Sequence, residues 1–170
     1  MIYLLDTNTF IKAKNDFYAY DIVPAFWQVL LEKFLSGSVK VIDAVFEELL
    51  KGNDNLTDWV KKNISDAEDV NGQGYIVRVK HDKNVIDNYK IIANKVYSNK
   101  YYSEENKQHF LSVADPWLVA AASMYGDTVV TFEKLAGANT RKIKIPDICQ
   151  QMNVSFINLY EMMRNIQIKI

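Results

Sequence analysis

Short apolar runs alternate along the chain with longer segments whose apolar residues recur at helical spacing. Met1–Leu5 is an unbroken apolar run, the pattern of a strand that is covered on both faces. Similar short runs, with many β-branched residues, predict further strands at Val39–Ile42, Asp127–Phe132 and Val154–Ile157. The chain should therefore contain a small sheet whose strands are separated by helices.

The predicted helices have clear start and stop signals. Asp115 and Pro116 suit the N-cap and the first turn of one helix, and Gly126 ends it. Asp43 is predicted to cap another helix in the same way. The full set of predicted helices is Thr7–Lys14, Pro24–Leu35, Asp43–Leu50, Asp54–Asn63, Val85–Tyr97, Asp115–Tyr125, Pro146–Met152 and Asn158–Ile166.

Two polar stretches interrupt this alternation. Asp66–Gly74 has the composition of a loop, within which Asp69-Val70 is a candidate for a small strand, and the longer run Asp66–Lys83 is the expected place for an insertion. Ser98–Lys107 is polar and charged and is expected at the surface.

Strands that alternate with helices predict an α/β fold, with a central parallel sheet and helices on both faces. The expected architecture is a three-layer α/β/α sandwich. With 170 residues and no internal repeat, low-complexity tract or linker, residues 1–170 should form a single domain.

Composition excludes several classes of protein. No apolar run approaches the roughly 20 residues that span a bilayer, and Met1–Leu5 is too short and lacks the basic lead of a signal peptide. Cys149 is the single cysteine, which excludes an internal disulfide and a Cys-rich zinc site. We therefore expect a cytoplasmic protein with no membrane segment. The net charge of −1 means that nucleic acid would need a local basic patch.

Acidic residues stand at the ends of predicted strands or on the helices that follow. Asp6 comes directly after the first strand, and Glu133 follows the strand Asp127–Phe132. Glu48 lies on the helix after the second strand, and Asp115 opens a helix of small apolar residues. Because ligand sites of parallel sheets form beyond the carboxyl ends of the strands, these carboxylates are expected to converge at one edge.

The two adjacent glutamates of the second motif differ in the face that they present. Phe46, Leu49 and Leu50 define the apolar side of the helix, so Glu47 should point to solvent and Glu48 toward the site.

Converging carboxylates repel one another, and their pKa values rise unless a cation neutralises them. Oxygen ligands with no Cys or His nearby favour Mg²⁺ or Mn²⁺. Such a site suits the hydrolysis of a phosphodiester by a metal-activated water. The sequence has no G-x-S-x-G, Walker or H-E-x-x-H motif, so nothing indicates a covalent nucleophile.

Four segments together resemble the acidic motifs of PIN-domain (PilT N-terminus) nucleases, close to the VapC-type toxins of bacterial toxin–antitoxin systems. They occur in the family's order and are Leu4–Ile11, Glu48–Gly52, Ala114–Ala122 and Val129–Lys134. The resemblance implies a PIN-like α/β/α fold and Mg²⁺- or Mn²⁺-dependent endoribonuclease activity on single-stranded or looped RNA. It also implies a cognate antitoxin protein as a partner, and a homodimer.

The resemblance assigns roles residue by residue. Asp6, Glu48 and Asp115 match the metal-binding acids, and Asn8 matches the small polar residue that follows the first acid. The fourth motif usually reads Thr-x-Asp, whereas here it is Thr131-Phe132-Glu133. Glutamate is one methylene longer, so it stays open whether Glu133 ligates directly or through water, and whether one or two ions bind.

Other polar residues are candidates for contacts with substrate or around the ligands. Asn8 and Thr131 could orient metal-held water, with helix capping and strand packing as the alternatives. Arg141 and Lys142, in a basic cluster that ends at Lys144, could hold an RNA backbone, or could simply face solvent. Lys100-Tyr101-Tyr102 combines a cation with rings that can stack on bases.

Two other functions compete with the nuclease. A catalytically degenerate PIN-like domain would bind RNA or a protein partner without cleaving RNA, an interpretation that Glu133 motivates. A phosphatase of the haloacid dehalogenase kind also begins with an Asp after the first strand. That chemistry needs a second acid two residues later, where this chain has Asn8.

Overall fold

The sheet at the centre of the computed structural model has five strands in the order β3-β2-β1-β4-β5. Every neighbouring pair is parallel. In the central strand, Tyr3 lies opposite Val39 on one side and Thr128 on the other. The strands are β1 Tyr3–Leu5, β2 Val39–Ile42, β3 Ile76–Val77, β4 Thr128–Val130 and β5 Phe156–Ile157. The structure describes residues 1–137 and 139–170.

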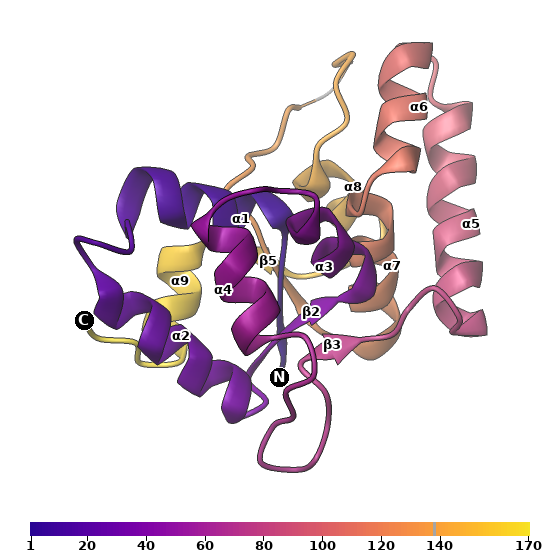
Figure 1. The fold of residues 1–170 in the computed structure, drawn as a ribbon. Coiled ribbons are helices and arrows are strands. Elements are labelled where there is room, and N and C mark those ends of the chain that lie inside the picture. Colours follow the sequence, from indigo (N-terminus) through magenta and orange to yellow (C-terminus); the bar gives the residue numbers. More distant parts are fainter. Residues whose placement is uncertain (138) are drawn as a thin grey trace.

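Helices cover both faces of this sheet. Helices α2, α4 and α9 lie on one side of the strands, and α5, α6 and α7 lie on the other (Figure 1). The predicted three-layer α/β/α sandwich with a parallel sheet is therefore confirmed. The helices are α1 Thr7–Lys12 with its π-helical continuation η1 Ala13–Phe17, α2 Pro24–Leu35, α3 Asp43–Leu50, α4 Asn55–Asn63, α5 Lys83–Ser98, α6 Glu104–Ser112, α7 Asp115–Tyr125, α8 Ile145–Gln151 and α9 Leu159–Asn165.

The three inner strands are buried on both faces, whereas the edge strand β5 is only half-buried. Every residue of β1, β2 and β4 is buried. Because the strands are so short, their carboxyl ends lie close to the core, and the residues that follow them are partly shielded from water as well. This shielding later determines the electrostatics of the acidic residues.

One prediction for the polar stretches was wrong and another was incomplete. Glu68 and Gly74 form only an isolated antiparallel bridge, and the edge strand is Ile76–Val77 instead of Asp69-Val70. The segment Ser98–Lys107 lies mostly at the surface, as predicted, but α6 begins within it. Lys107 there is buried and pairs with the Glu104 carboxylate at 2.7 Å.

A buried ion pair organises the loop before β3. Lys40 projects from β2, and its Nζ lies 3.3 Å from Oδ2 of Asp69. The other Asp69 oxygen accepts hydrogen bonds from the backbone N–H groups of Asn71 and Gln73. Hydrogen bonds and the Lys40 ammonium hold the pKa of Asp69 below its ordinary value. A charged residue therefore sits in a central β-strand because the loop supplies its counter-ion.

Gly37 should be intolerant of any side chain, because its φ is +73° and an added Cβ would lie 2.8 Å from Oδ2 of Asp69. Gly126 has the same φ but open space around it, which makes it a matched control. We expect Gly126→Ala to lower the free energy of unfolding by about 1 kcal/mol, because alanine is strained in the left-handed backbone conformation. Gly37→Ala should lose clearly more in urea unfolding. Equal losses would mean that the Asp69 contact does not restrict this position.

Among the described residues, no helix is long and apolar enough to cross a membrane.

Candidate functional site

The predicted acids meet at the carboxyl edge of the sheet. Asp6 follows β1 directly, and Glu133 comes three residues after the end of β4. Glu48 lies on α3, which starts where β2 ends, and Asp115 is the first residue of α7, which contacts both β2 and β4. The parallel strands, joined by long helical crossovers, thus bring four distant parts of the sequence to one edge of the sheet.

Asp6 is almost fully buried, with 1% of its surface exposed. One carboxylate oxygen caps α1 by accepting the backbone N–H of Thr9. The other accepts the Thr131 hydroxyl at 2.7 Å. Burial raises the pKa of Asp6 from its ordinary 3.8 to about 6, although these hydrogen bonds oppose the rise. Asp6 therefore both caps α1 and lies in the acidic site, and the Thr131 hydroxyl orients its carboxylate.

Glu48 connects three helices through its two oxygens. Its Oε1 accepts the backbone N–H of Ala114 at 2.8 Å, at the start of α7. Its Oε2 accepts the hydroxyl of Thr7 from α1 at 2.5 Å. Glu47, by contrast, is exposed and pairs with Lys80. The predicted division between the two glutamates is thus confirmed: Glu48 faces the acidic edge and Glu47 faces solvent.

Asp115 does not cap its helix, which corrects the predicted N-cap. Ala114 occupies the N-cap position, and Asp115 is the first helical residue. Among the side-chain hydrogen bonds of residues 1–137 and 139–170, none reaches the Asp115 carboxylate. Burial, followed by the charges of Glu133, Asp6 and Glu48, raises its pKa to about 7, and only Lys144 opposes the rise. The four carboxylates therefore share one electrostatic environment.

The other predicted cap, Asp43, is also the first residue of its helix, with Ile42 at the N-cap position. Its carboxylate accepts the backbone N–H groups of Ala44, Val79 and Lys80. Asp43 therefore anchors the chain that follows β3, and it is not part of the acidic site.

Glu133 is held by the start of α8. Its Oε1 lies 2.6 Å from the Lys144 ammonium, and its Oε2 accepts the backbone N–H of Ile145 at 2.8 Å. Its own backbone N–H donates to the Thr131 hydroxyl at 3.1 Å. The longer side chain thus reaches a partner on the next helix, which neutralises part of the negative charge at the edge.

A cavity of about 220 Å³ opens over Asp115 and Glu133. Asn8, Lys142 and Lys144 line it, as sequence reasoning partly anticipated. Arg141 does not line it: its side chain is exposed, and its carbonyl accepts the Asn106 amide at 2.8 Å. The complete lining is Asn8, Asn106, His109, Phe110, Asp115, Glu133, Lys142, Ile143 and Lys144.

Four polar residues of this site were not assigned to it from sequence. Lys144 belonged to the recognised basic cluster, but which cation of that cluster faces the acids depends on the path of the loop. Thr7 was a candidate for capping or for positioning water or phosphate, and its hydroxyl instead donates to Glu48. Asn106 and His109 come from α6, whose helical pattern was masked by its polar composition. No short motif links any of them to the acids.

The donor set suits a hard divalent cation by its chemistry, since it consists of carboxylate oxygens, and the pKa values of Asp6 and Asp115 are raised. The side chains of the described residues, however, are not arranged around a single metal position. Within residues 1–137 and 139–170, no three His, Cys, Asp or Glu side chains are arranged around one metal position. Asp6, Glu48 and Glu133 each direct their oxygens to protein donors, and Asp115 alone keeps its carboxylate free of such bonds.

The fold is similar to that of a solved structure of low sequence identity. A chain in the crystal structure of VapBC2 from Rickettsia felis bound to a DNA fragment from their promoter has a TM-score of 0.53 and 14% identity, covering 93% of this chain and 98% of that chain. This likeness and the all-parallel sheet show that the protein has a three-layer α/β/α fold, which it shares with that chain. Residues 3–170 match the family described as "Domain of unknown function (DUF4411)", and the chain belongs to that family. A comparison with curated proteins finds no match.

Proposed function

We propose that this protein is a Mg²⁺- or Mn²⁺-dependent endoribonuclease that acts as the toxin of a toxin–antitoxin pair. The observation that supports it most is the concentration of negative charge at the carboxyl edge of the sheet, which Lys144 compensates only in part. Asp6 and Asp115 are shielded from water and close enough to the other acids that their pKa values rise to about 6 and about 7. A folded protein that concentrates acids in this way is suited to bind a cation there.

In this proposal Asp6, Glu48 and Asp115 hold the cation, and Glu133 assists. A divalent cation at such a site supplies an activated water and stabilises charge on the leaving oxygen. Thr131 and the Thr9 N–H fix the orientation of Asp6, and Thr7 and the Ala114 N–H fix Glu48. Lys142 and Lys144, which line the acidic cavity, contact a phosphate group of the RNA in this proposal.

The proposed substrate is single-stranded RNA, and the proposed partner is an antitoxin protein. Both rest on the motif resemblance, and the likeness to a chain of VapBC2 from Rickettsia felis adds a fold of the same kind. A homodimer is proposed on the resemblance alone.

Asp6→Asn should abolish cleavage of labelled single-stranded RNA in the presence of Mn²⁺. The asparagine keeps an oxygen for the Thr9 cap but loses the negative charge, so cleavage should fall by more than about 100-fold, beyond the loss seen for residues that only support ligands. Product lengths on denaturing gels measure it. Glu47→Gln is the matched control, since Glu47 pairs with Lys80 away from the edge.

Equal cleavage by wild type and Asp6→Asn would remove Asp6 from the mechanism. Cleavage by wild type that persists in excess EDTA would remove the metal.

A second function, binding without cleavage, is favoured by the partners of Glu133. Lys144 and the Ile145 N–H occupy both of its oxygens, as expected of an acid that stabilises the fold. Calorimetric titration with Mn²⁺ separates the two functions. A nuclease should show a heat change that saturates at a stoichiometric site, which Asp115→Asn removes, and a degenerate domain should show no such site.

A further inference from the structure

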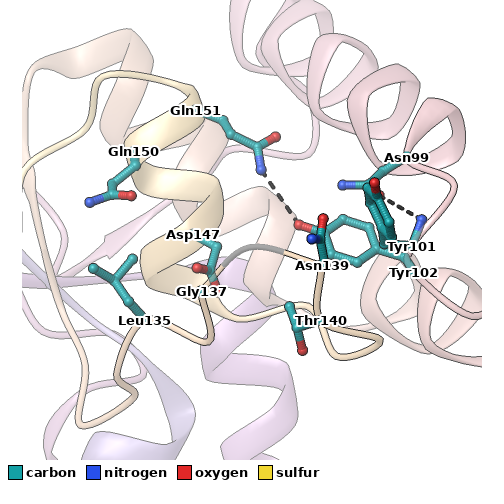
Figure 2. A pocket seen from close by; sticks show the side chains of 10 residues that line it. All are labelled: Asn99, Tyr101, Tyr102, Leu135, Gly137, Asn139, Thr140, Asp147, Gln150 and Gln151. Carbon is teal, nitrogen blue, oxygen red and sulfur yellow. Dashed lines mark hydrogen bonds between the residues drawn. The ribbon is translucent and has the colours of Figure 1, made fainter.

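A second cavity, separate from the acidic one, has a different chemistry. It has a volume of about 420 Å³ and lies between the α5–α6 connection, α8 and the segment after Glu133. Four amide side chains and two tyrosines dominate its wall, and we call it the amide pocket (Figure 2). Its lining residues are Asn99, Tyr101, Tyr102, Leu135, Gly137, Asn139, Thr140, Asp147, Gln150 and Gln151.

The two tyrosines have different positions in this pocket. Tyr102 is 7% exposed, and its hydroxyl accepts from Nε2 of Gln151 at 3.5 Å, as Figure 2 shows. Tyr101 is 47% exposed, so its ring is available for stacking. Nζ of Lys100 lies 5.5 Å from the centre of that ring. An aromatic face with a neighbouring cation is the usual platform for a base and its phosphate.

The amides suit the edges of a nucleobase. Each carboxamide offers both a donor and an acceptor, and such pairs match the Watson–Crick and Hoogsteen edges of unstacked bases. Asp147, the one acid in the wall, has its oxygens engaged by the backbone N–H of Ala136 at 3.1 and 3.2 Å. The remaining wall is uncharged, which favours a neutral heterocycle over a phosphate or a carboxylate.

A neighbouring cavity is lined by lysines, which the described lining of the amide pocket itself lacks. It has a volume of about 420 Å³ and shares Asn99, Tyr101 and Gln151 with the amide pocket. Lys95 and Lys100 complete its positive side. A nucleotide whose base occupied the amide pocket would thus have lysines beside its phosphate.

One segment connects the amide pocket to the acidic edge. Leu135 and Thr140 form part of the amide pocket, and Glu133 and Lys142, from the same segment, line the acidic cavity. Arg141 fixes this wall, since its carbonyl accepts the Asn106 side-chain amide at 2.8 Å and the Ser103 N–H at 3.4 Å. An RNA strand that runs from the amide pocket to the acidic cavity would pass the exposed Arg141 and Lys142 side chains.

We propose that the amide pocket binds one nucleobase of a single-stranded RNA whose phosphodiester lies at the acidic edge. The inference rests on the proposed function for the second half of this statement, and it names the part of the molecule that gives the cleavage its sequence preference. Tyr101 stacks on the base, and Gln151 and Asn99 discriminate among bases by hydrogen bonding.

The test measures binding without cleavage. Short homopolymers of A, C, G and U, labelled with fluorescein, are titrated with full-length protein in EDTA, and fluorescence anisotropy gives the affinities. We expect unequal affinities for the four polymers. Tyr101→Ala should weaken the preferred polymer by about ten-fold. Gln151→Ala should reduce the ratio between the best and the worst polymer.

Two exposed residues outside these pockets serve as matched controls. Tyr97 lies on α5 and is 57% exposed, and Gln108 is exposed on α6. Tyr97→Ala and Gln108→Ala should bind as wild type does. Circular dichroism of all four variants checks that each is folded.

Each outcome has one meaning. Binding that is equal for all polymers, or pocket variants that behave like the controls, overturns the amide pocket and leaves the nuclease proposal standing. Absence of any RNA binding also overturns it. Binding of free nucleoside monophosphates with no binding of RNA would show a nucleotide site that is unrelated to the strand. Base-dependent binding in a protein that never cleaves would support the pocket and contradict the nuclease.

Discussion

Asp115→Asn is expected to abolish Mn²⁺-dependent RNA cleavage and, at the same time, to stabilise the metal-free protein at about pH 8. The carboxylate accepts none of the side-chain hydrogen bonds found among the described residues, so the amide loses no known contact. It removes a negative charge from beside Glu133, Asp6 and Glu48. Above a pKa of about 7 that charge opposes folding, and its loss should add on the order of 1 kcal/mol of unfolding free energy.

The two effects are measured separately. Cleavage should fall by more than about 100-fold on labelled RNA, and urea unfolding in EDTA should show the gain in stability. Asp21→Asn, at an exposed position, is the matched control and should change neither. A variant that is both inactive and destabilised would place Asp115 among the residues that hold the fold, and would contradict its assignment to a cation site.

The stability of the metal-free protein should fall as pH rises from about 5 to about 8. Asp6 and Asp115 have folded-state pKa values of about 6 and about 7, above the ordinary 3.8 of the unfolded chain. Between about pH 4 and pH 7 the folded protein therefore holds protons that the unfolded chain has lost, so unfolding releases protons and becomes easier with rising pH. Melting curves in EDTA at several pH values measure this slope, which Asp115→Asn should reduce.

Mn²⁺ should reverse this loss. A cation that binds deprotonated carboxylates of the folded state raises the melting temperature most at about pH 8, and little at about pH 5, where protons compete for the same oxygens. Glu47→Gln should respond as wild type does. A melting temperature that neither falls with pH nor rises with Mn²⁺ would contradict a cation site made of these acids.

The alternation of short apolar runs and helices was enough to predict the layered fold, because burial on both faces requires unbroken apolar strands. It was not enough for β3. A two-residue edge strand, Ile76–Val77, has no periodicity to detect, and it forms because Val41 and Ile42 offer an unpaired edge. Helix α6 was missed for a related reason. Its sequence is polar, and the partners of Lys107 and Phe110 are set by packing.

The acids themselves could be picked from the sequence, because each stands near a strand end or on the helix that follows a strand. The hydrogen-bond partners of each acid could not be predicted in the same way. Asp115 was expected to cap α7, but the chain enters that helix one residue earlier, and the carboxylate is left without a capping bond. Glu133 was recognised as unusual, yet its pairing with Lys144 depends on how the intervening loop returns to α8.

Local sequence thus determined which elements form and which chemical groups stand at their ends, since apolar spacing and capping act over a few residues. Tertiary structure alone decided how close those groups lie, how far they are buried from solvent and which of them are neutralised by a cation. The reason is physical: burial and charge–charge interactions depend on distances between segments more than 100 residues apart, such as Asp6 and Thr131, and no local pattern encodes such a distance.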